Sequence, residues 1–186
     1  MTGFIDILED EHQIIVRVLE VIEAEVARLD AGGTPDSHFI ELAISFFQEF
    51  ADKAHHGKEE ALLFPLLAAK KNIIRDGPIK VLLAEHESGR YFARELRAGL
   101  LDLAAGDAKA TPRIRRALSL YAQMLRKHIA KEEEIVFLLA QVLLSEEETA
   151  SLALQFQQDQ EKAPPRALDI VRELESIAPA RKPLSG

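Results

Sequence analysis

Apolar residues recur along most of the chain at alternating spacings of three and four residues, which places them on one face of an α-helix. Strict alternation of apolar and polar residues, the pattern of a half-buried strand, is absent. Segments rich in Gly, Pro, Asp and Asn interrupt the helical pattern at residues 32–36, 72–78 and 106–112. The pattern therefore predicts an all-α fold in which four long helices form an up-down-up-down bundle closed by short loops.

The helical pattern becomes shorter after the fourth stretch. Ser145 and Glu148 have the spacing of a capping box, in which each side chain bonds the backbone of the other residue, and they predict the start of a fifth helix. The two prolines at 164–165 predict the start of another short helix. We therefore expect one domain, with the bundle over residues 1–144 and a helical extension with a tail over 145–186.

A histidine interrupts the apolar face of each of the four long predicted helices, and a glutamate follows it one turn later in the second and the fourth. Residues four apart share a face of a helix, so a His-x-x-x-Glu pair can bind one metal through both side chains, or lend its carboxylate to a second metal. Two such pairs stand in segments that echo each other, because residues 55–64 and 128–137 share His, Lys, two Glu and Phe at the same offsets. The candidate ligands, in order along the chain, are His12, His55, Glu59, His86, His128 and Glu132.

A second pair in the same predicted helix, His56 and Glu60, competes with His55 and Glu59. It is rotated by about 100° around the helix axis. Its stripe also contains charged residues, which is typical of a side that faces solvent. We therefore favour His55 and Glu59, and keep His56 and Glu60 as alternative ligands or as neighbours of the ligands.

Each candidate ligand has an ordinary structural explanation when it is taken alone. A single histidine on an apolar face is more often a hydrogen-bonded core residue than a ligand, and a surface pair such as His128 with Glu132 stabilises a helix only slightly. Four imidazoles and two carboxylates in one bundle core, however, have a desolvation cost of several kcal/mol unless they are paired or bind metal. The set as a whole therefore favours a metal site.

Composition excludes several classes of site and partner. The chain has 186 residues, a net charge of -8 and no cysteine, which excludes thiolate zinc sites, iron–sulfur clusters and cysteine nucleophiles. Its basic residues form no cluster, so nucleic acid is not an expected partner, and the acidic balance argues against docking on an anionic membrane. No apolar run is long enough to cross a bilayer and no secretory signal opens the chain, so we expect a cytoplasmic protein.

The ligand types narrow the choice of metal. Neutral imidazole and carboxylate without thiolate suit iron, manganese or zinc. Six ligands exceed the needs of one ordinary site, and they fit two metals that share the carboxylates and an oxo or hydroxo bridge. Incomplete ligation by the protein leaves a position for dioxygen, peroxide or nitric oxide.

Four motifs occur in a fixed order: His12, then His55-x-x-x-Glu59 ahead of Leu62-Leu63-Phe64-Pro65, then Glu85-His86-Glu87, then His128-x-x-x-Glu132 ahead of Val136-Phe137. This order resembles the hemerythrin-like (HHE cation-binding) domain over about residues 4–143. The resemblance implies two iron ions joined by an oxo or hydroxo group and bridged by Glu59 and Glu132. It also implies that His12 and His55 serve mainly one iron, and that the other is served mainly by His86 and His128.

One position departs from this resemblance. Oxygen-carrying hemerythrins have a second histidine one turn after the ligand of the third helix, and this chain has Arg90 there. One iron would then have fewer protein ligands, so Arg90 could cover the open position or stabilise an anion such as peroxide, or Tyr121 could approach the metals. The resemblance then favours sensing, iron handling or stress defence, through bound dioxygen, nitric oxide or peroxide, over reversible oxygen carriage.

Two alternatives stay open. The chain could be a helical interaction module that binds no metal or a different metal. With less support, it could be a mononuclear or zinc-dependent hydrolase, for which no further nucleophile or general base stands out. The predicted C-terminal helices have apolar faces that could pack on the bundle or on another chain, so a monomer and a homodimer are both compatible with the sequence.

Overall fold

The computed structural model describes residues 3–161 and 166–177, and all regular secondary structure in these residues is helical. The all-α prediction is therefore confirmed. The proline pair at 164–165 and the predicted tail over 178–186 lie outside the described residues. In chain order the elements are α1 (Phe4–Asp30), α2 (Ser37–Ser45), η1 (Phe46–His56), η2 (Glu59–Leu63), α3 (Phe64–Lys70), α4 (Asn72–Ile74), η3 (Arg75–Ile79), α5 (Lys80–Ala104), α6 (Ala110–Lys131), η4 (Glu132–Val136), α7 (Phe137–Leu143), α8 (Glu146–Glu161) and α9 (Arg166–Ile177), where η marks a π-helix.

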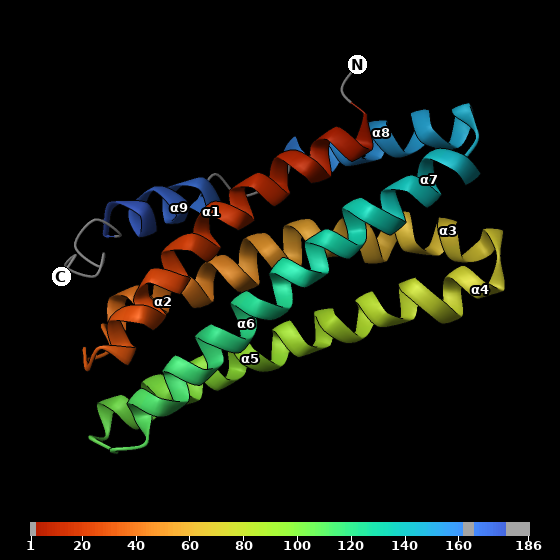
Figure 1. Ribbon diagram of the computed structural model, residues 1–186. Helices are drawn as coiled ribbons and strands as arrows, with labels where there is room; N and C mark the ends of the chain where they lie inside the picture. Colours follow the sequence, from red (N-terminus) through yellow and green to blue (C-terminus); the bar gives the residue numbers. More distant parts are fainter. Residues whose placement is uncertain (1–2, 162–165, 178–186) are drawn as a thin grey trace.

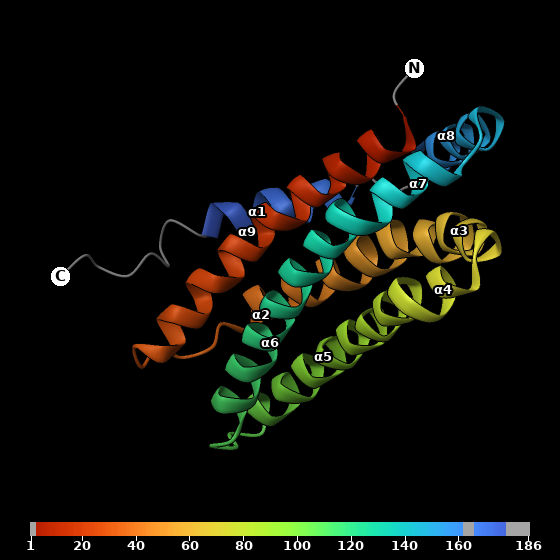
Figure 2. The same cartoon turned by 45° about the vertical axis from the view of Figure 1, so that its right-hand side comes forward.

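Four helical segments lie alongside one another in both views (Figures 1 and 2). They are α1, the run from α2 to α3, the run from α4 to α5, and the run from α6 to α7. Helix α6 packs against both α5 and α1, and η1 packs against α5. Within the described ranges, no helix is long and apolar enough to cross a membrane.

The helices end where the sequence pattern breaks. After α1, Gly32 has a φ of 88°, in the left-handed region that glycine adopts without strain. Gly106, which follows α5, also has a left-handed backbone, with a φ of 72°. The Asp36 side chain caps α2, because it accepts hydrogen bonds from the backbone N–H groups of His38 (3.0 Å) and Phe39 (3.3 Å).

The C-terminal helices cover one side of α1 (Figure 1). The predicted capping box opens α8: the Ser145 N–H donates to Glu148 Oε2 (2.8 Å), and the Glu148 N–H donates to Ser145 Oγ (3.2 Å). Phe156 of α8 meets Phe4 of α1 edge-on, with ring centroids 5.9 Å apart. Leu174 of α9 is fully buried. The extension therefore adds apolar side chains to both ends of the core.

Buried apolar side chains form two clusters separated by a polar layer. In α1, Leu8 belongs to one cluster and Ile15 to the other, and the buried His12 lies between them in the chain. The other three segments repeat this order: Ala51 and Leu63 flank His55, Leu96 and Leu82 flank His86, and Leu125 and Val136 flank His128. The packing of the two apolar clusters thus holds four histidines at the same level of the bundle.

Wider, π-helical turns coincide with this polar layer. The η1 helix ends at His56, η2 begins at Glu59, and η4 begins at Glu132. In a π-helix the backbone hydrogen bonds join residues five apart instead of four, so successive side chains are rotated by a smaller angle than in an α-helix. Adjacent residues such as His55 and His56 can then both face the core.

Helices α5 and α6 approach closely at Gly99, where a β-carbon would lie 2.6 Å from Ile114 Cγ1. We expect Gly99→Ala to destabilise the protein by about 1–3 kcal/mol, because the branched Ile114 side chain would have to leave a packed contact. Urea denaturation measures this change. Gly57→Ala is a suitable control, since a β-carbon there would meet its nearest neighbour at 3.7 Å. Equal stability of the two variants would contradict the close packing of these helices.

Candidate metal centre

The six residues predicted as ligands meet in the polar layer. Each of them is buried, with at most 1% of its surface exposed. All four helical segments contribute: α1 supplies His12, η1 and η2 supply His55 and Glu59, α5 supplies His86, and α6 and η4 supply His128 and Glu132. The structure therefore brings together residues that are as much as 120 positions apart in the chain.

The histidine rings point toward one another in pairs. His12 Nε2 lies 3.1 Å from His55 Nε2, and His86 Nε2 lies 3.1 Å from His128 Nε2. Because each pair directs two nitrogens at one point, the layer divides into two groups of ligands. They are referred to below as the His12 half, with His12 and His55, and the His86 half, with His86 and His128.

Two carboxylates connect the halves. Glu132 Oε2 lies 3.2 Å from His12 Nε2, and its Oε1 lies 3.0 Å from His128 Nε2. Glu59 Oε1 lies 3.8 Å from His55 Nε2, and its Oε2 lies 3.6 Å from His86 Nε2. Each carboxylate therefore directs one oxygen to each half.

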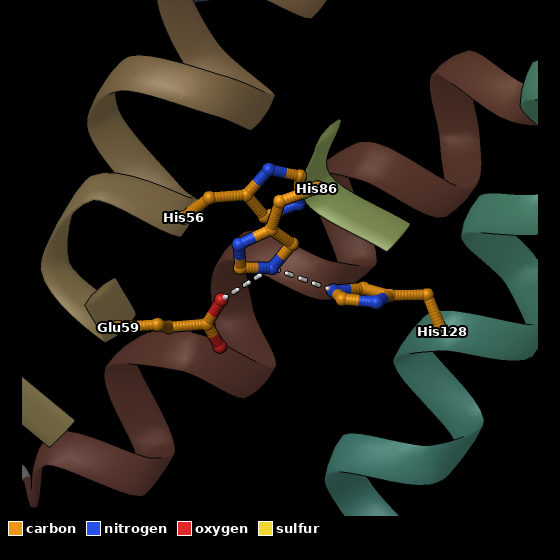
Figure 3. Close-up of side chains that lie close together, drawn as sticks. All are labelled: His56, Glu59, His86 and His128. Carbon is orange, nitrogen blue, oxygen red and sulfur yellow. Dashed lines mark hydrogen bonds and ion pairs between the residues drawn. The ribbon is translucent and has the colours of Figure 1, made fainter. Parts of the chain in front are cut away.

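A fifth histidine, His56, joins the His86 half. Its side chain is buried, and its ring stacks on that of His86 with centroids 3.8 Å apart and 11° between the planes. Figure 3 shows His56, Glu59, His86 and His128 gathered together, and ligand atoms of these four residues all lie within 4.8 Å of one another. The expectation that the His56 stripe faces solvent is wrong for His56, because the π-helical turns bring both adjacent histidines into the core.

An outer ring of carboxylates holds the histidines in place. A carboxylate only accepts hydrogen bonds, so each Nδ1 must donate its proton to the carboxylate beside it. When the ring is neutral, its lone pair is then on Nε2, which faces the centre, as a metal ligand requires. The four contacts are His12 with Glu133 (2.9 Å), His55 with Glu11 (2.9 Å), His86 with Glu60 (2.6 Å) and His128 with Glu85 (3.0 Å).

Two lysines complete this outer ring. Lys58 donates to Glu11, and Lys131 donates to Glu85. Burial raises the pKa of Glu11, but the hydrogen bond from His55 and the charge of Lys58 outweigh burial, so the pKa is lowered and the carboxylate stays ionised. Sequence reasoning kept Glu60 as an alternative ligand or a neighbour of the ligands, but it assigned no role to Glu11, Glu85, Glu133 or the two lysines. The signal was present in the two segments that echo each other, which share a lysine and a second glutamate as well as the ligands.

Arg90 and Tyr121 lie beside the His86 half. The Arg90 guanidinium donates to three carboxylates, those of Asp52 (2.8 Å), Glu87 (2.6 Å) and Glu60 (2.7 Å). Because Glu60 also bonds His86, Arg90 supports the outer ring. Tyr121 is buried, and its ring stacks on Phe47 with centroids 3.7 Å apart.

The inner carboxylates need a partner. Among the described residues, the oxygens of Glu59 and Glu132 and both ring nitrogens of His56 form no hydrogen bond. Burial and the neighbouring Glu132 raise the pKa of Glu59 well above its usual value. Burial also opposes the charge of Glu132, but His128 and His12 outweigh it and lower its pKa well below the usual value. Buried carboxylates without hydrogen bonds are costly, and a bound cation would supply the missing partner.

The protonation of His55 and His86 also suits a metal. Burial, together with His56 and His128, lowers the pKa of His86 to about 3. Burial also lowers the pKa of His55. Both imidazoles are therefore neutral at pH 7, as metal ligands must be. Neutral imidazoles and carboxylates without thiolate are a donor set that fits iron, manganese or zinc.

Removal of an outer-ring carboxylate is expected to weaken metal binding. Glu11→Gln should lower the metal affinity of the His12 half by roughly 10–100-fold, because the neutral amide has only one acceptor oxygen for the two donors, His55 and Lys58, that Glu11 serves. Competition with a coloured chelator measures this affinity. Glu9→Gln is the control, since Glu9 lies on the exposed side of α1. Equal affinities of the two variants would show that Glu11 does not orient the ligand.

Comparison with known proteins agrees with this geometry. The hemerythrin HHE cation binding domain matches residues 3–140. Uncharacterised proteins of Mycobacterium bovis and of two Mycobacterium tuberculosis strains are each 25% identical to the chain over 154 residues, which is 82% of this chain and 59% of the relative. The chain thus spans about three fifths of the length of these relatives, and no solved structure matches it significantly. By the match over most of its length, the chain belongs to the hemerythrin HHE cation-binding domain family.

Proposed function

We propose that this protein binds two iron ions in an up-down-up-down four-helix bundle and uses them to bind dioxygen, nitric oxide or peroxide in sensing, iron handling or stress defence. The observation that carries the proposal is the placement of Glu59 and Glu132. Each directs one oxygen to a histidine of either half. A carboxylate in this position suits a bridge between two cations, as in other helical bundles that hold two metals.

The ligand groups support two metal positions. The ligand atoms within each group lie within 4.8 Å of one another, and Glu59 belongs to both groups. When bound, a pair of irons supplies redox chemistry and exchangeable ligand positions that side chains lack. The chain's own part is to hold the imidazoles by their Nδ1 atoms and to exclude water by burial. The proposed ligands are His12 and His55 for one iron, His56, His86 and His128 for the other, and Glu59 and Glu132 between them.

The charge around the centre also favours cations. Besides the two inner carboxylates, four outer carboxylates bond the histidines. In the described part of the chain, the basic residues that bond these outer carboxylates are Lys58, Lys131 and Arg90. Acidic groups therefore exceed basic groups around a buried site, and the positive charge of bound metal would offset this excess where the dielectric constant is low.

Metal analysis tests the proposal. Protein loaded anaerobically with ferrous ion and desalted is expected to retain about two irons per chain. Exposure to air should then produce the near-ultraviolet absorption of an oxo-bridged ferric pair. His38→Ala should load equally, because the His38 side chain is 60% exposed and bonds Glu173 outside the centre. Less than one iron per chain after loading would contradict a di-iron protein.

A helical interaction module that works without metal is the second candidate, and an exposed apolar surface favours it. Ile73 of α4 is 78% exposed, and Leu138 and Val142 of α7 are 54% and 80% exposed. These residues line one groove at the end of the bundle. Exposed aliphatic patches are typical of interaction surfaces. Under this alternative His12→Ala leaves the stability of the protein unchanged in the presence of iron, whereas the di-iron proposal expects a loss.

A further inference from the structure

The two halves of the centre have equivalent ligands but different surroundings. When Glu11-His12 is aligned with Glu85-His86, the residues that follow pair as Ile15 with Gly89, Val16 with Arg90, and Leu19 with Ala93. When His128 is aligned with His55, Leu125 pairs with Asp52 and Ile129 with His56. Asp52 and His56 are close to His55 in the chain, but they line a wall together with His86. The residues beside the His86 half are thus small or polar, and the residues at the equivalent positions on the other side are all aliphatic.

This difference coincides with a cavity beside the His86 half. The cavity has a volume of about 280 Å³, and its walls include His56, His86, Gly89 and Ala93. On the other side, the equivalent Ile15, Leu19 and Leu125 are at most 1% exposed and belong to the apolar core. Small residues in place of large aliphatic ones therefore leave space beside the second ligand group.

The cavity reaches from the metal ligands to the surface. Two of its wall residues, His56 and His86, belong to the ligand group of the His86 half. Two others, Asp52 and Arg90, are 30% and 28% exposed and bond each other at 2.8 Å. A small molecule that passes these two residues therefore meets the histidines directly.

The walls of the cavity suit a ligand that both donates and accepts hydrogen bonds. The Tyr121 hydroxyl lies 3.9 Å from the point where a β-carbon of Gly89 would lie, so this donor group stands in the wall of the cavity beside Gly89. His56 is 2% exposed, and neither of its ring nitrogens forms a hydrogen bond within the described part of the chain. Dioxygen and nitric oxide donate no hydrogen bond, so they gain little from such walls.

The charge at the mouth favours a neutral ligand over an anion. Arg90 and Arg94 are the two arginines in the cavity wall, and Arg90 already bonds Asp52, Glu60 and Glu87. These three carboxylates outnumber the two guanidinium groups, so the mouth has no surplus positive charge that would attract an anion. Hydrogen peroxide is small, neutral at pH 7, and both donates and accepts hydrogen bonds.

We propose that this cavity is the binding pocket and access route through which hydrogen peroxide reaches the metals. The proposal rests on the proposed di-iron function and narrows its ligand to the peroxide class. Within the pocket, Tyr121 would donate a hydrogen bond to peroxide and His56 would face it from the side of the ligands. Arg90, held by three carboxylates, forms the wall at the mouth. It positions Glu60, which bonds His86.

Variants that fill the cavity test the access route. Ala93→Leu gives the His86 half the residue that the His12 half has at the equivalent position, Leu19. Gly89→Ala is the gentler variant, because its β-carbon would meet Met124 and Tyr121 at 3.4 and 3.6 Å, which is ordinary contact. Ala117→Leu is the matched control, since Ala117 lines a separate cavity of about 430 Å³ between α5 and α6.

Two measurements report on access. Stopped-flow mixing of the iron-loaded protein with hydrogen peroxide gives a second-order rate constant from the change in absorbance of the bound metal. The water-proton relaxation rate of the manganese(II)-loaded protein reports how freely water reaches the metals. Ala93→Leu is expected to slow the reaction with peroxide by at least about tenfold, with a smaller effect of Gly89→Ala and none of Ala117→Leu. The relaxation rate should fall in the same order.

A third variant tests the class of ligand. Tyr121→Phe keeps the ring stacked on Phe47 and removes only the hydroxyl, so it should slow association of peroxide and leave that of nitric oxide unchanged. Equal effects on both ligands would overturn the peroxide assignment. Unchanged rates in Ala93→Leu and Gly89→Ala, with full metal content, would overturn the cavity as the route. Wild-type protein that retains no iron would contradict the di-iron function itself, and metal analysis shows this separately.

Discussion

Replacing Glu132 with glutamine is expected to reduce the bound metal from about two ions per chain to one or fewer. Glutamine keeps the shape of the side chain but changes one carboxylate oxygen into an NH₂ group that can only donate. The two oxygens of Glu132 lie 3.2 Å from His12 Nε2 and 3.0 Å from His128 Nε2. Whichever way the amide turns, one half of the centre loses an anionic ligand and the other keeps only a neutral oxygen.

The loss of affinity should exceed the roughly 10–100-fold expected for an outer-ring carboxylate, because Glu132 would contact the metals directly. Metal analysis after anaerobic loading measures the stoichiometry, and chelator competition measures the affinity. Glu134→Gln is the matched control, since Glu134 is exposed two residues away in the same helix. If Glu132→Gln binds as much iron as Glu134→Gln, Glu132 does not bridge the metals.

The helices and most of the candidate ligands could be predicted from the sequence, because both follow from local spacing. The heptad-like pattern identified the apolar faces, and Gly32 and Gly106 marked the helix ends through their backbone freedom. His12 and His128 stood out because they occupy positions that the pattern reserves for apolar side chains. A polar residue in an apolar stripe can be recognised as a candidate ligand from one helix alone, without knowing which helix packs against it.

His56 and the outer ring could not be assigned in the same way. A helical wheel assumes a constant rotation per residue, and the π-helical turns around His56 break that assumption. The contact between Glu11 and His55 joins two helices, so it depends on how those helices face each other. The cavity beside the His86 half depends on side chains that are absent at Gly89 and Ala93. Such space becomes visible only when the neighbouring helices are in place.

Removal of the metal is expected to destabilise the protein by several kcal/mol. A ligand at a hundred times its dissociation constant stabilises the folded state by about 2.7 kcal/mol per site, and the centre contains two groups of ligand atoms. Removal also leaves the buried oxygens of Glu59 without hydrogen bonds. Urea denaturation with and without a chelator measures the difference. The chelator should have little effect on Glu132→Gln, which is expected to hold less metal from the start.

This destabilisation should grow as the pH rises, because of His128. In the protein without metal, burial opposes the charge of His128, but Glu132 and Glu85 raise its pKa to about 9 from 6.5. A histidine with a raised pKa stabilises the folded state fully below 6.5, and this contribution is lost as the pH rises through about 9. The raised pKa of Glu59 acts in the same direction, since the folded state holds that proton more tightly as well. Metal-bound His128 has no proton to lose at Nε2, so the stability of the iron-loaded protein should stay level over this range. Parallel pH profiles for the two forms would show that no metal takes the place of that proton.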